Sequence, residues 1–372
     1  MSNNPRKYNL PRDIPGLQAL RGIAVLAVVA SHLHVSVSED PYFATVTPWS
    51  WMNQALSRGF LGVDLFFVLS GFLITSLLFR DGEMNSAPML RRFYARRALR
   101  LLPALYALLF TSLVIAIYES FPLEYQWNST WRALLFMSNW KFQSVFLRTQ
   151  DDIGHLWSLA VEEQFYIIWP LFFIFLRRVW THWITTVVVL SFIVLAIALY
   201  RDNLWNSEIP WLFIYPSTEA RADAILIGCI CAYVYRYLEI PPRLLQILGY
   251  TSAVTLLLVG YQYAIHDQKF LYKGGFTLIA ILNGVIILAT AKLPTFGGRM
   301  LHSKILKWWG QRSYGMYLWH FLVFRLLSRH NLFSPSLLRI TVALTLSVAV
   351  TEASWRWIEQ PFIRVKDRRF SH

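Results

Sequence analysis

Apolar residues in this 372-residue chain fall into long runs that are separated by short polar stretches. A helix that crosses a bilayer needs about 20 mostly apolar residues, and ten of the runs approach that length. We therefore predict an all-α fold, a polytopic membrane bundle of about ten transmembrane helices without a soluble domain. The predicted spans cover residues 17–38, 60–79, 101–118, 162–176, 183–200, 219–238, 244–264, 274–291, 312–330 and 336–358.

The charges between these runs predict how the bundle is oriented. Lysine and arginine gather in both terminal tails and in every second connection, whereas the other connections have sparse or mixed charge. By the positive-inside rule, the basic regions lie on the cytoplasmic side. We therefore predict a multi-pass protein of a bacterial inner membrane with both termini in the cytoplasm.

Two local features set the expected boundaries. Residues 131–147 are apolar but contain Asn139 and Lys141. A further span here would invert the charge pattern, so we expect an interfacial or re-entrant element instead. Pro361 is expected to end the last helix. The predicted regions are a cytoplasmic tail at 1–16, a transmembrane domain at 17–360 and a second cytoplasmic tail at 361–372.

Composition supports a membrane protein and argues against one that binds nucleic acid. Hydrophobic residues make up 56% of the chain and charged residues 15%, against roughly 25% charged in an average soluble domain. The net charge of +14 comes from short basic runs between apolar stretches, which is the pattern of membrane orientation. Cys229 and Cys231 would point about 200° apart on a helix, so we expect packed or lipid-facing thiols and no disulfide. We also expect no metal cofactor.

The first predicted span contains two ionisable residues, Arg21 and His32. Such groups are costly at membrane depth and usually face a cavity or a partner. Eleven helical residues return to within about 20° of the same face, and they place His32 roughly 16 Å beyond Arg21 toward the outside. A histidine at a helix end can be merely interfacial. Because Arg21 lies on the same face, we favour the interpretation that His32 is a general base, which takes a proton from a hydroxyl at physiological pH.

More polar groups gather in the predicted external half of the bundle. They are Asp64, His155, Glu162, Glu163, Arg221 and Asp223. His155 and Glu162 stand two helical turns apart and share a face if their helix begins early. Together the groups have the composition of a buried site with a base and an orienting carboxylate. Each could also be an ion pair at a helix end, and the neighbours Glu162 and Glu163 point about 100° apart, so only one readily faces the site.

The predicted cytoplasmic side suggests a different chemistry. The run MLRRFYARRALRLLP places arginines 91, 92, 96, 97 and 100 together. Such a cluster is common at the cytoplasmic ends of spans, where it binds lipid headgroups. Guanidinium groups also suit the phosphates of a nucleotide-like donor. Near the C-terminus, SYGMYLWH places His320 in mid-span among aromatic residues, and Glu359 and Arg364 fall at the cytoplasmic boundary.

Several motifs together resemble the membrane acyltransferase-3 family. They are Arg21 with His32, GVDLFFVLSGFLIT, the arginine run ending in RLLP, HLWSLAVEEQFYIIWP, RADAILIG, SYGMYLWH and EQPFIR. The resemblance extends from about residue 13 to about residue 365, with the motifs in the family's order. It implies an integral membrane enzyme that O-acylates surface polysaccharides, lipid-linked sugars, peptidoglycan or secondary metabolites. Some family members add an extracellular hydrolase-like domain, whereas this chain looks like the stand-alone form.

The resemblance implies a donor and a set of roles. The donor would be an acyl-coenzyme A, most often acetyl-coenzyme A, with its phosphates on Arg96, Arg97 and Arg100, and with Arg92 beside them. His32 would be the general base toward a carbohydrate or glycolipid acceptor that arrives from outside. Glu162 or Asp64 would orient the imidazole, and Arg21 would hold the donor or stabilise the oxyanion. Acceptor binding would fall to His155, Glu163, Arg221, Asp223 and His320.

Other functions remain open from the sequence. A transporter would also suit ten spans with charges near the midplane, although the two halves share no evident repeat. A structural membrane subunit would not require so many ionisable residues at depth. The same chemistry could instead act on a macrolide or a lipid. Ser70 and Ser158 are candidate nucleophiles, but small hydroxyls at helix contacts more often serve packing. The sequence therefore does not distinguish direct transfer of the acyl group from transfer through a covalent acyl-enzyme.

Overall fold

A computed structural model describes residues 14–38, 56–81, 86–140, 152–180, 182–263, 267–330 and 336–370, which form helices and turns without a strand. The longer helices are α1 (Pro15–Ser38), α4 (Gly62–Asp81), α5 (Ser86–Tyr118), α6 (Leu123–Leu134), α8 (Trp157–Val179), α9 (Trp183–Asn206), α11 (Thr218–Tyr237), α12 (Pro242–Tyr263), α13 (Phe276–Lys292), α15 (Lys304–Gln311), α16 (Ser313–Arg329), α17 (Ser336–Ser354) and α18 (Gln360–Arg369). Shorter turns are η2 (Arg58–Leu61), η3 (Gly154–Leu156), α10 (Trp211–Ile214), η4 (Leu271–Gly275), α14 (Gly298–Leu301) and η5 (Trp355–Glu359).

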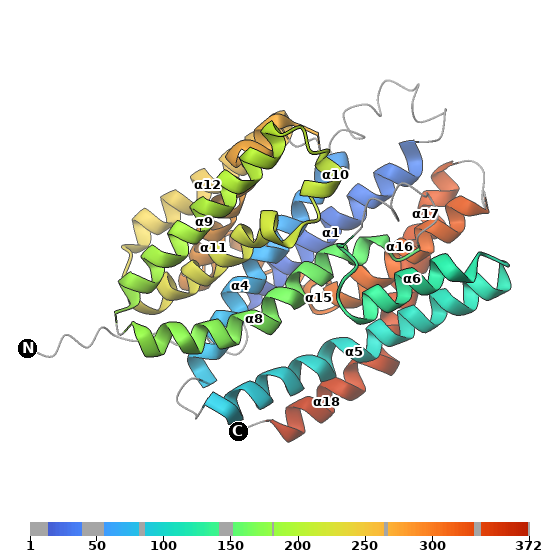
Figure 1. Ribbon diagram of the computed structural model, residues 1–372, viewed down its shortest axis with the longest axis horizontal. Helices are drawn as coiled ribbons and strands as arrows, with labels where there is room; N and C mark the ends of the chain where they lie inside the picture. Colours follow the sequence, from blue (N-terminus) through green and yellow to red (C-terminus); the bar gives the residue numbers. More distant parts are fainter. Residues whose placement is uncertain are drawn as a thin grey trace, which may run out of the picture. The chain divides into compact units, whose positions relative to one another are not determined.

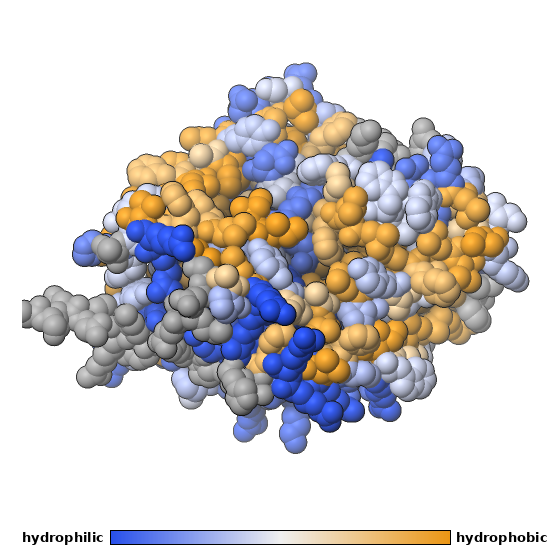
Figure 2. All heavy atoms as spheres, turned by 60° about the horizontal axis from the view of Figure 1, so that its bottom comes forward, coloured by the Kyte–Doolittle hydropathy of each residue, from blue (hydrophilic) through white to orange (hydrophobic). Residues whose placement is uncertain are grey.

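The helices confirm a bundle that suits a membrane. Each predicted span overlaps one helix, and 7 helical segments among the described residues are long and apolar enough to cross a bilayer. These segments are Pro15–Leu33, Arg58–Asp81, Ala87–Tyr118, Gly154–Val179, Trp183–Asn206, Pro242–Tyr263 and Leu271–Lys292. Of the other predicted spans, the one in α11 includes four charged residues, and α16 is 17 residues long. Large apolar side chains face outward, as Leu257 does at 75% exposed, and Figure 2 shows such side chains over wide areas of one face.

The chain divides into two compact units. The first comprises residues 1–24, 61–89 and 161–310, and the second comprises residues 25–60, 90–160 and 311–372. In the first unit, α11 packs against α4, α9 and α13, while α12 packs against α13. In the second unit, α16 packs against α17, and η5 joins α17 to α18. Figure 1 shows α5 and α18 of this second unit side by side.

Helices α4 and α11 approach each other so closely that their backbones touch. A Cβ at Gly71 of α4 would collide with the carbonyl oxygen of Ile225, and a Cβ at Gly228 of α11 would collide with that of Val68. Small residues are the usual means of close helix contact in membranes, where lipid removes the hydrophobic drive for association. These two glycines therefore fix the spacing of α4 and α11.

We expect Gly228→Ala to destabilise the protein by about 1–3 kcal/mol or more, because the added methyl group must push the two backbones apart. The measurement is the thermal unfolding midpoint of the detergent-purified protein. Gly260→Ala in α12 is the matched control, since a Cβ there would meet only Leu61 Cδ1 at 3.5 Å, an ordinary contact. Equal midpoints for the two variants would contradict the close approach.

The structure corrects two predicted boundaries. Helix α5 begins at Ser86 and not near residue 101, so the arginine run lies on a helix and not in a connection. Arginine is a good helix former, and its long side chain reaches water from a helix end. Pro361 does not end the last helix either. The chain stays helical through a π-helical turn and into α18, where proline in the first turn has no hydrogen bond to lose.

Two other expectations hold within the described residues. Helix α6 ends at Leu134 and residues 135–140 follow as turns, so this part of 131–147 is not a span; residues 141–147 lie outside the described residues. Cys229 and Cys231 are both buried free thiols. They are packed small side chains of α11 and do not face lipid.

Candidate active site

Three histidines meet within the second unit, although they are far apart in sequence. His32 comes from α1, His155 from η3 and His320 from α16. The ring centroids of His32 and His320 are 5.1 Å apart, and those of His155 and His320 are 5.5 Å apart. Because η3 is a 3₁₀ turn ahead of α8, His155 does not continue the α-helical face of Glu162 as the sequence spacing suggested. All three histidines were predicted site residues.

The hydrogen bonds of this cluster determine where the protons lie. His320 Nδ1 is 2.8 Å from the carbonyl oxygen of Met316, which can only accept, so this nitrogen carries a proton. In neutral His320 the other nitrogen, Nε2, is then an acceptor. It lies 2.8 Å from Nδ1 of His32, which must therefore be the donor. In neutral His32, Nε2 is therefore the unprotonated nitrogen, the form that a general base requires.

His155 differs from its two neighbours. It is 3% exposed, and neither of its ring nitrogens has a hydrogen-bond partner among the described residues. Its ring lies 4.7 Å from that of Phe321 and 6.4 Å from that of His32. Buried polar groups are nearly always paired, and an exception calls for a functional explanation. The described residues hold no group of three His, Cys, Asp or Glu side chains arranged for a metal ion.

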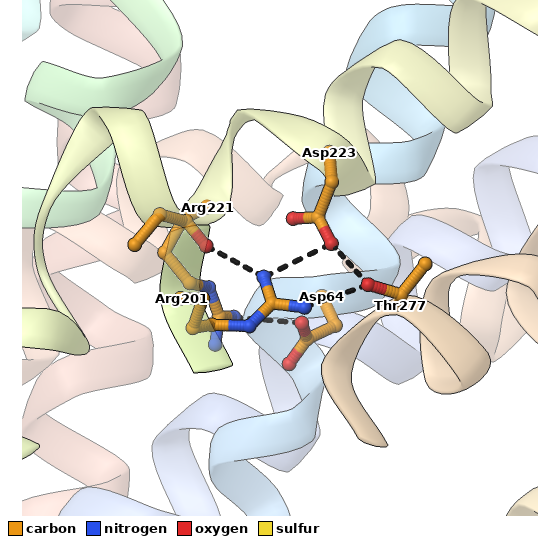
Figure 3. Close-up of polar contacts among 6 residues, drawn as sticks. Asp64, Arg201, Arg221, Asp223 and Thr277 are labelled. Carbon is orange, nitrogen blue, oxygen red and sulfur yellow. Dashed lines mark hydrogen bonds and ion pairs between the residues drawn. The ribbon is translucent and has the colours of Figure 1, made fainter. Parts of the chain in front are cut away.

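A second polar cluster lies inside the first unit, where two arginines and two aspartates form a buried network (Figure 3). Arg221 Nη2 donates to Asp64 Oδ1 at 2.7 Å, and Arg201 Nη1 donates to Asp223 Oδ2 at 3.0 Å. Thr277 joins the network by donating to Asp223 Oδ2 at 2.6 Å. These residues come from the ends of α4, α9, α11 and α13 that the charge pattern assigns to the external side. Asp64, Arg221 and Asp223, predicted for the site, thus act here as ion-pair partners.

The network is balanced in charge but not fully bonded. Arg221 stacks on Phe276, with its guanidinium carbon 3.7 Å from the ring centroid. Its Nε and Nη1, Asp64 Oδ2 and Asp223 Oδ1 have no hydrogen-bond partner among the described residues. A buried ion pair is worth retaining only where its geometry is good and its remaining atoms are satisfied. These four atoms therefore leave part of the network's hydrogen-bonding capacity unused.

The remaining acidic candidates also lie in the first unit. Glu162 Oε1 accepts a 2.6 Å hydrogen bond from the hydroxyl of Ser70, which joins α8 to α4. Its neighbour Glu163 is more buried, at 5% exposed. Arg21 lies half-buried on the part of α1 that belongs to this unit, whereas His32 lies on the part that belongs to the second.

The predicted donor arginines lie on α5 in the second unit. Two of them converge on one oxygen, because Arg92 Nη2 and Arg96 Nη2 lie 2.8 Å and 2.7 Å from the carbonyl oxygen of Phe370. Both guanidinium groups thus point to one acceptor, as they would toward a phosphate oxygen. Arg97 is half-buried on the same helix and Arg100 is exposed.

Sequence reasoning missed two network residues and one buried tyrosine. Arg201 is fully buried, but its place beside Asp202 at the end of an apolar run made it look like a loop charge. A lone cation at the end of an otherwise apolar helix was the available signal. Thr277 gave none. Tyr317 lies three residues before His320, one turn away on α16, and that spacing was readable.

Comparison with known proteins gives a consistent family. The acyltransferase-3 family model, an acyltransferase domain, matches residues 14–355. A peptidoglycan O-acetyltransferase of Listeria monocytogenes, OatA, is 33% identical over 96% of this chain and 56% of its own length. YrhL of Bacillus subtilis, provisionally named a peptidoglycan O-acetyltransferase, is 32% identical over 97% of this chain and 56% of its own length. No solved structure matches the chain.

The chain spans just over half the length of these relatives. The family match nevertheless covers most of the helices described above, including α1, α8 and α16 with the three histidines. On this match, the chain belongs to the acyltransferase-3 family of membrane acyltransferase enzymes.

Proposed function

We propose that this protein transfers an acetyl group from acetyl-coenzyme A to a hydroxyl of a cell-surface sugar polymer, with His32 as general base. Peptidoglycan is the acceptor that the names of the relatives give. The observation that carries the proposal is the hydrogen bond between His32 Nδ1 and His320 Nε2. Because His320 Nδ1 donates to the carbonyl of Met316, this bond makes Nε2 the unprotonated nitrogen of neutral His32. In this proposal the protein lies in a bacterial inner membrane, and the donor comes from the cytoplasm.

The reaction would proceed by direct transfer. His32 Nε2 takes the proton of the acceptor hydroxyl as the hydroxyl oxygen attacks the thioester carbonyl. The tetrahedral intermediate expels the coenzyme A thiolate, which then receives that proton from the His32 imidazolium. His320 holds the His32 tautomer, as the acidic member of a serine-protease triad does. His155, with both ring nitrogens unpartnered, would hydrogen-bond the acceptor or the developing oxyanion.

The donor's phosphates would lie on the arginines of α5. The convergence of Arg92 and Arg96 on one carbonyl oxygen supports this assignment, since a phosphate oxygen is the stronger acceptor for two guanidinium groups. Arg97 and Arg100 would extend the site along the helix.

The test uses the purified protein in liposomes, with acetyl-coenzyme A labelled in its acetyl group and peptidoglycan fragments as acceptor. We expect free coenzyme A and labelled fragments to form in equal amounts. Coenzyme A release without labelled fragments would direct the same chemistry to another acceptor. Failure both to release coenzyme A and to bind it would favour a transporter and would overturn the proposal.

Arg96→Ala is expected to raise the KM for acetyl-coenzyme A about tenfold, because it removes a charge-assisted hydrogen bond to phosphate, with little change in kcat. Steady-state kinetics at varied donor concentration measures both constants. Arg91→Ala on the same helix is the matched control, since Arg91 is exposed. An equal rise in KM for the two variants would show that α5 contributes only its overall positive charge and no specific phosphate contact.

A further inference from the structure

The hydroxyl of Tyr317 is bonded to the segment that carries His155. Tyr317 Oη donates to the carbonyl oxygen of His155, and its oxygen is 2.9 Å from Ser158 Oγ. A phenol has a single proton, and that proton goes to the carbonyl, so Ser158 is the donor in the second bond. Tyr317 is 8% exposed, so these bonds are shielded from water. One side chain of α16 therefore holds two points of this segment.

The outer end of the same segment is also tied to α16. Arg329 forms ion pairs with Asp152 and with Glu119, the residue after α5. Asp152 is 2% exposed. Tyr317 and Arg329 stand twelve residues apart, about 18 Å along a straight helix. Residues 152–158 are thus attached to α16 at three points, through Asp152, His155 and Ser158.

The ring of His155 depends on this backbone attachment more than most buried rings do. Its nitrogens form no hydrogen bond among the described residues, so its position follows from its backbone and from ring contacts. One of those contacts is with Tyr317 itself, at a centroid distance of 5.1 Å, and His320 lies one turn further along α16. Tyr317 thus sets both the backbone and the ring of His155 relative to the helix that bears His320.

We propose that Tyr317 is a positioning residue that holds His155 in register with His32 and His320. The inference rests on the proposed function, in which His155 hydrogen-bonds the reacting groups. The hydroxyl of Tyr317 would touch no substrate. It would act through the carbonyl of His155, so its removal should have no effect in a protein that already lacks the His155 imidazole.

The test is a double-mutant cycle in acetyl transfer, which separates action through a shared group from independent action. We expect Tyr317→Phe to lower kcat about tenfold, the effect of losing buried hydrogen bonds that fix a reacting group, with the KM for acetyl-coenzyme A unchanged. Tyr317→Phe combined with His155→Ala should be no slower than His155→Ala alone. Tyr314→Phe is the control, because Tyr314 also lies on α16 and donates to a backbone carbonyl, that of Leu101, at 2.8 Å.

The outcomes distinguish the proposed role of His155 from the positioning role of Tyr317. Full activity of His155→Ala would remove the proposed role of His155, and the positioning role with it. A slow His155→Ala with an unchanged Tyr317→Phe would overturn the positioning role alone. Losses that multiply in the double variant would also overturn it, because Tyr317 would then act independently of His155. Equal losses in Tyr317→Phe and Tyr314→Phe would assign both tyrosines to general packing.

Discussion

Replacement of His32 by alanine is expected to lower kcat for acetyl transfer by about 10²- to 10⁴-fold, the usual contribution of a positioned general base. The hydrogen bond to His320 holds His32 in the tautomer whose Nε2 accepts a proton, and alanine removes that nitrogen. The KM for acetyl-coenzyme A should change little, because the arginines proposed to hold the donor lie on α5. Measurement of coenzyme A release in detergent or in liposomes gives both constants.

A surface histidine controls for the general effect of losing an imidazole. His302 is exposed, and its Nδ1 forms a hydrogen bond with the carbonyl oxygen of Gly298 in the same helical turn. His302→Ala should therefore keep wild-type activity. His320→Ala should lower kcat less than His32→Ala does. It removes the hydrogen bond that fixes the tautomer of His32, but the base itself stays in place. A His32→Ala protein that folds and keeps full kcat would show that the base lies elsewhere.

Loss of one partner from the buried ion-pair network should have the largest effect on stability. We expect Arg221→Met to lower the free energy of unfolding by about 3–5 kcal/mol, because Asp64 would be left as an uncompensated charge among buried side chains. Tryptophan fluorescence of the detergent-purified protein during thermal unfolding would follow the change. The loss should appear in the absence of any substrate, which distinguishes it from an effect on catalysis.

Replacement of both partners supplies the matched test. Asp64→Leu combined with Arg221→Met leaves no unpaired charge in this pair, and such apolar replacements are often neutral or stabilising. The double variant should therefore recover most of the loss. Arg356→Ala is the surface control, since Arg356 is 67% exposed in its pair with Glu352 and such pairs contribute about 0–1 kcal/mol. If Arg221→Met were no less stable than this control, the network would not support the first unit.

The sequence predicted the helices well because long apolar runs have few alternatives in a membrane chain. The exceptions lie where charge interrupts the pattern. The arginine run of α5 was predicted to lie in a connection because hydropathy shows only which residues tolerate lipid. A helix can extend beyond the bilayer, and α5 does so in the sense that its first turns contain the arginines. At Pro361 the pattern was judged by the rule for helix interiors, whereas this proline stands in a first turn.

The candidate site was predictable residue by residue but not contact by contact. His32, His155 and His320 each stood out as ionisable groups in apolar surroundings. That His32 donates to His320 depends on how distant helices pack, and periodicity along one helix has no information about its neighbour. The same limit applies to Arg201, whose aspartate partner stands 22 residues later on another helix.

The backbone contact between α4 and α11 also restricts how this sequence can vary. A side chain at position 71 or 228 needs space that the opposite helix backbone occupies, so a compensating change in a neighbouring side chain cannot supply it. Asp64 and Arg221 stand on the same two helices, and their 2.7 Å bond would lengthen with any separation. In a library of random substitutions selected for a folded protein, both positions should therefore return glycine almost exclusively, whichever acceptor the enzyme uses.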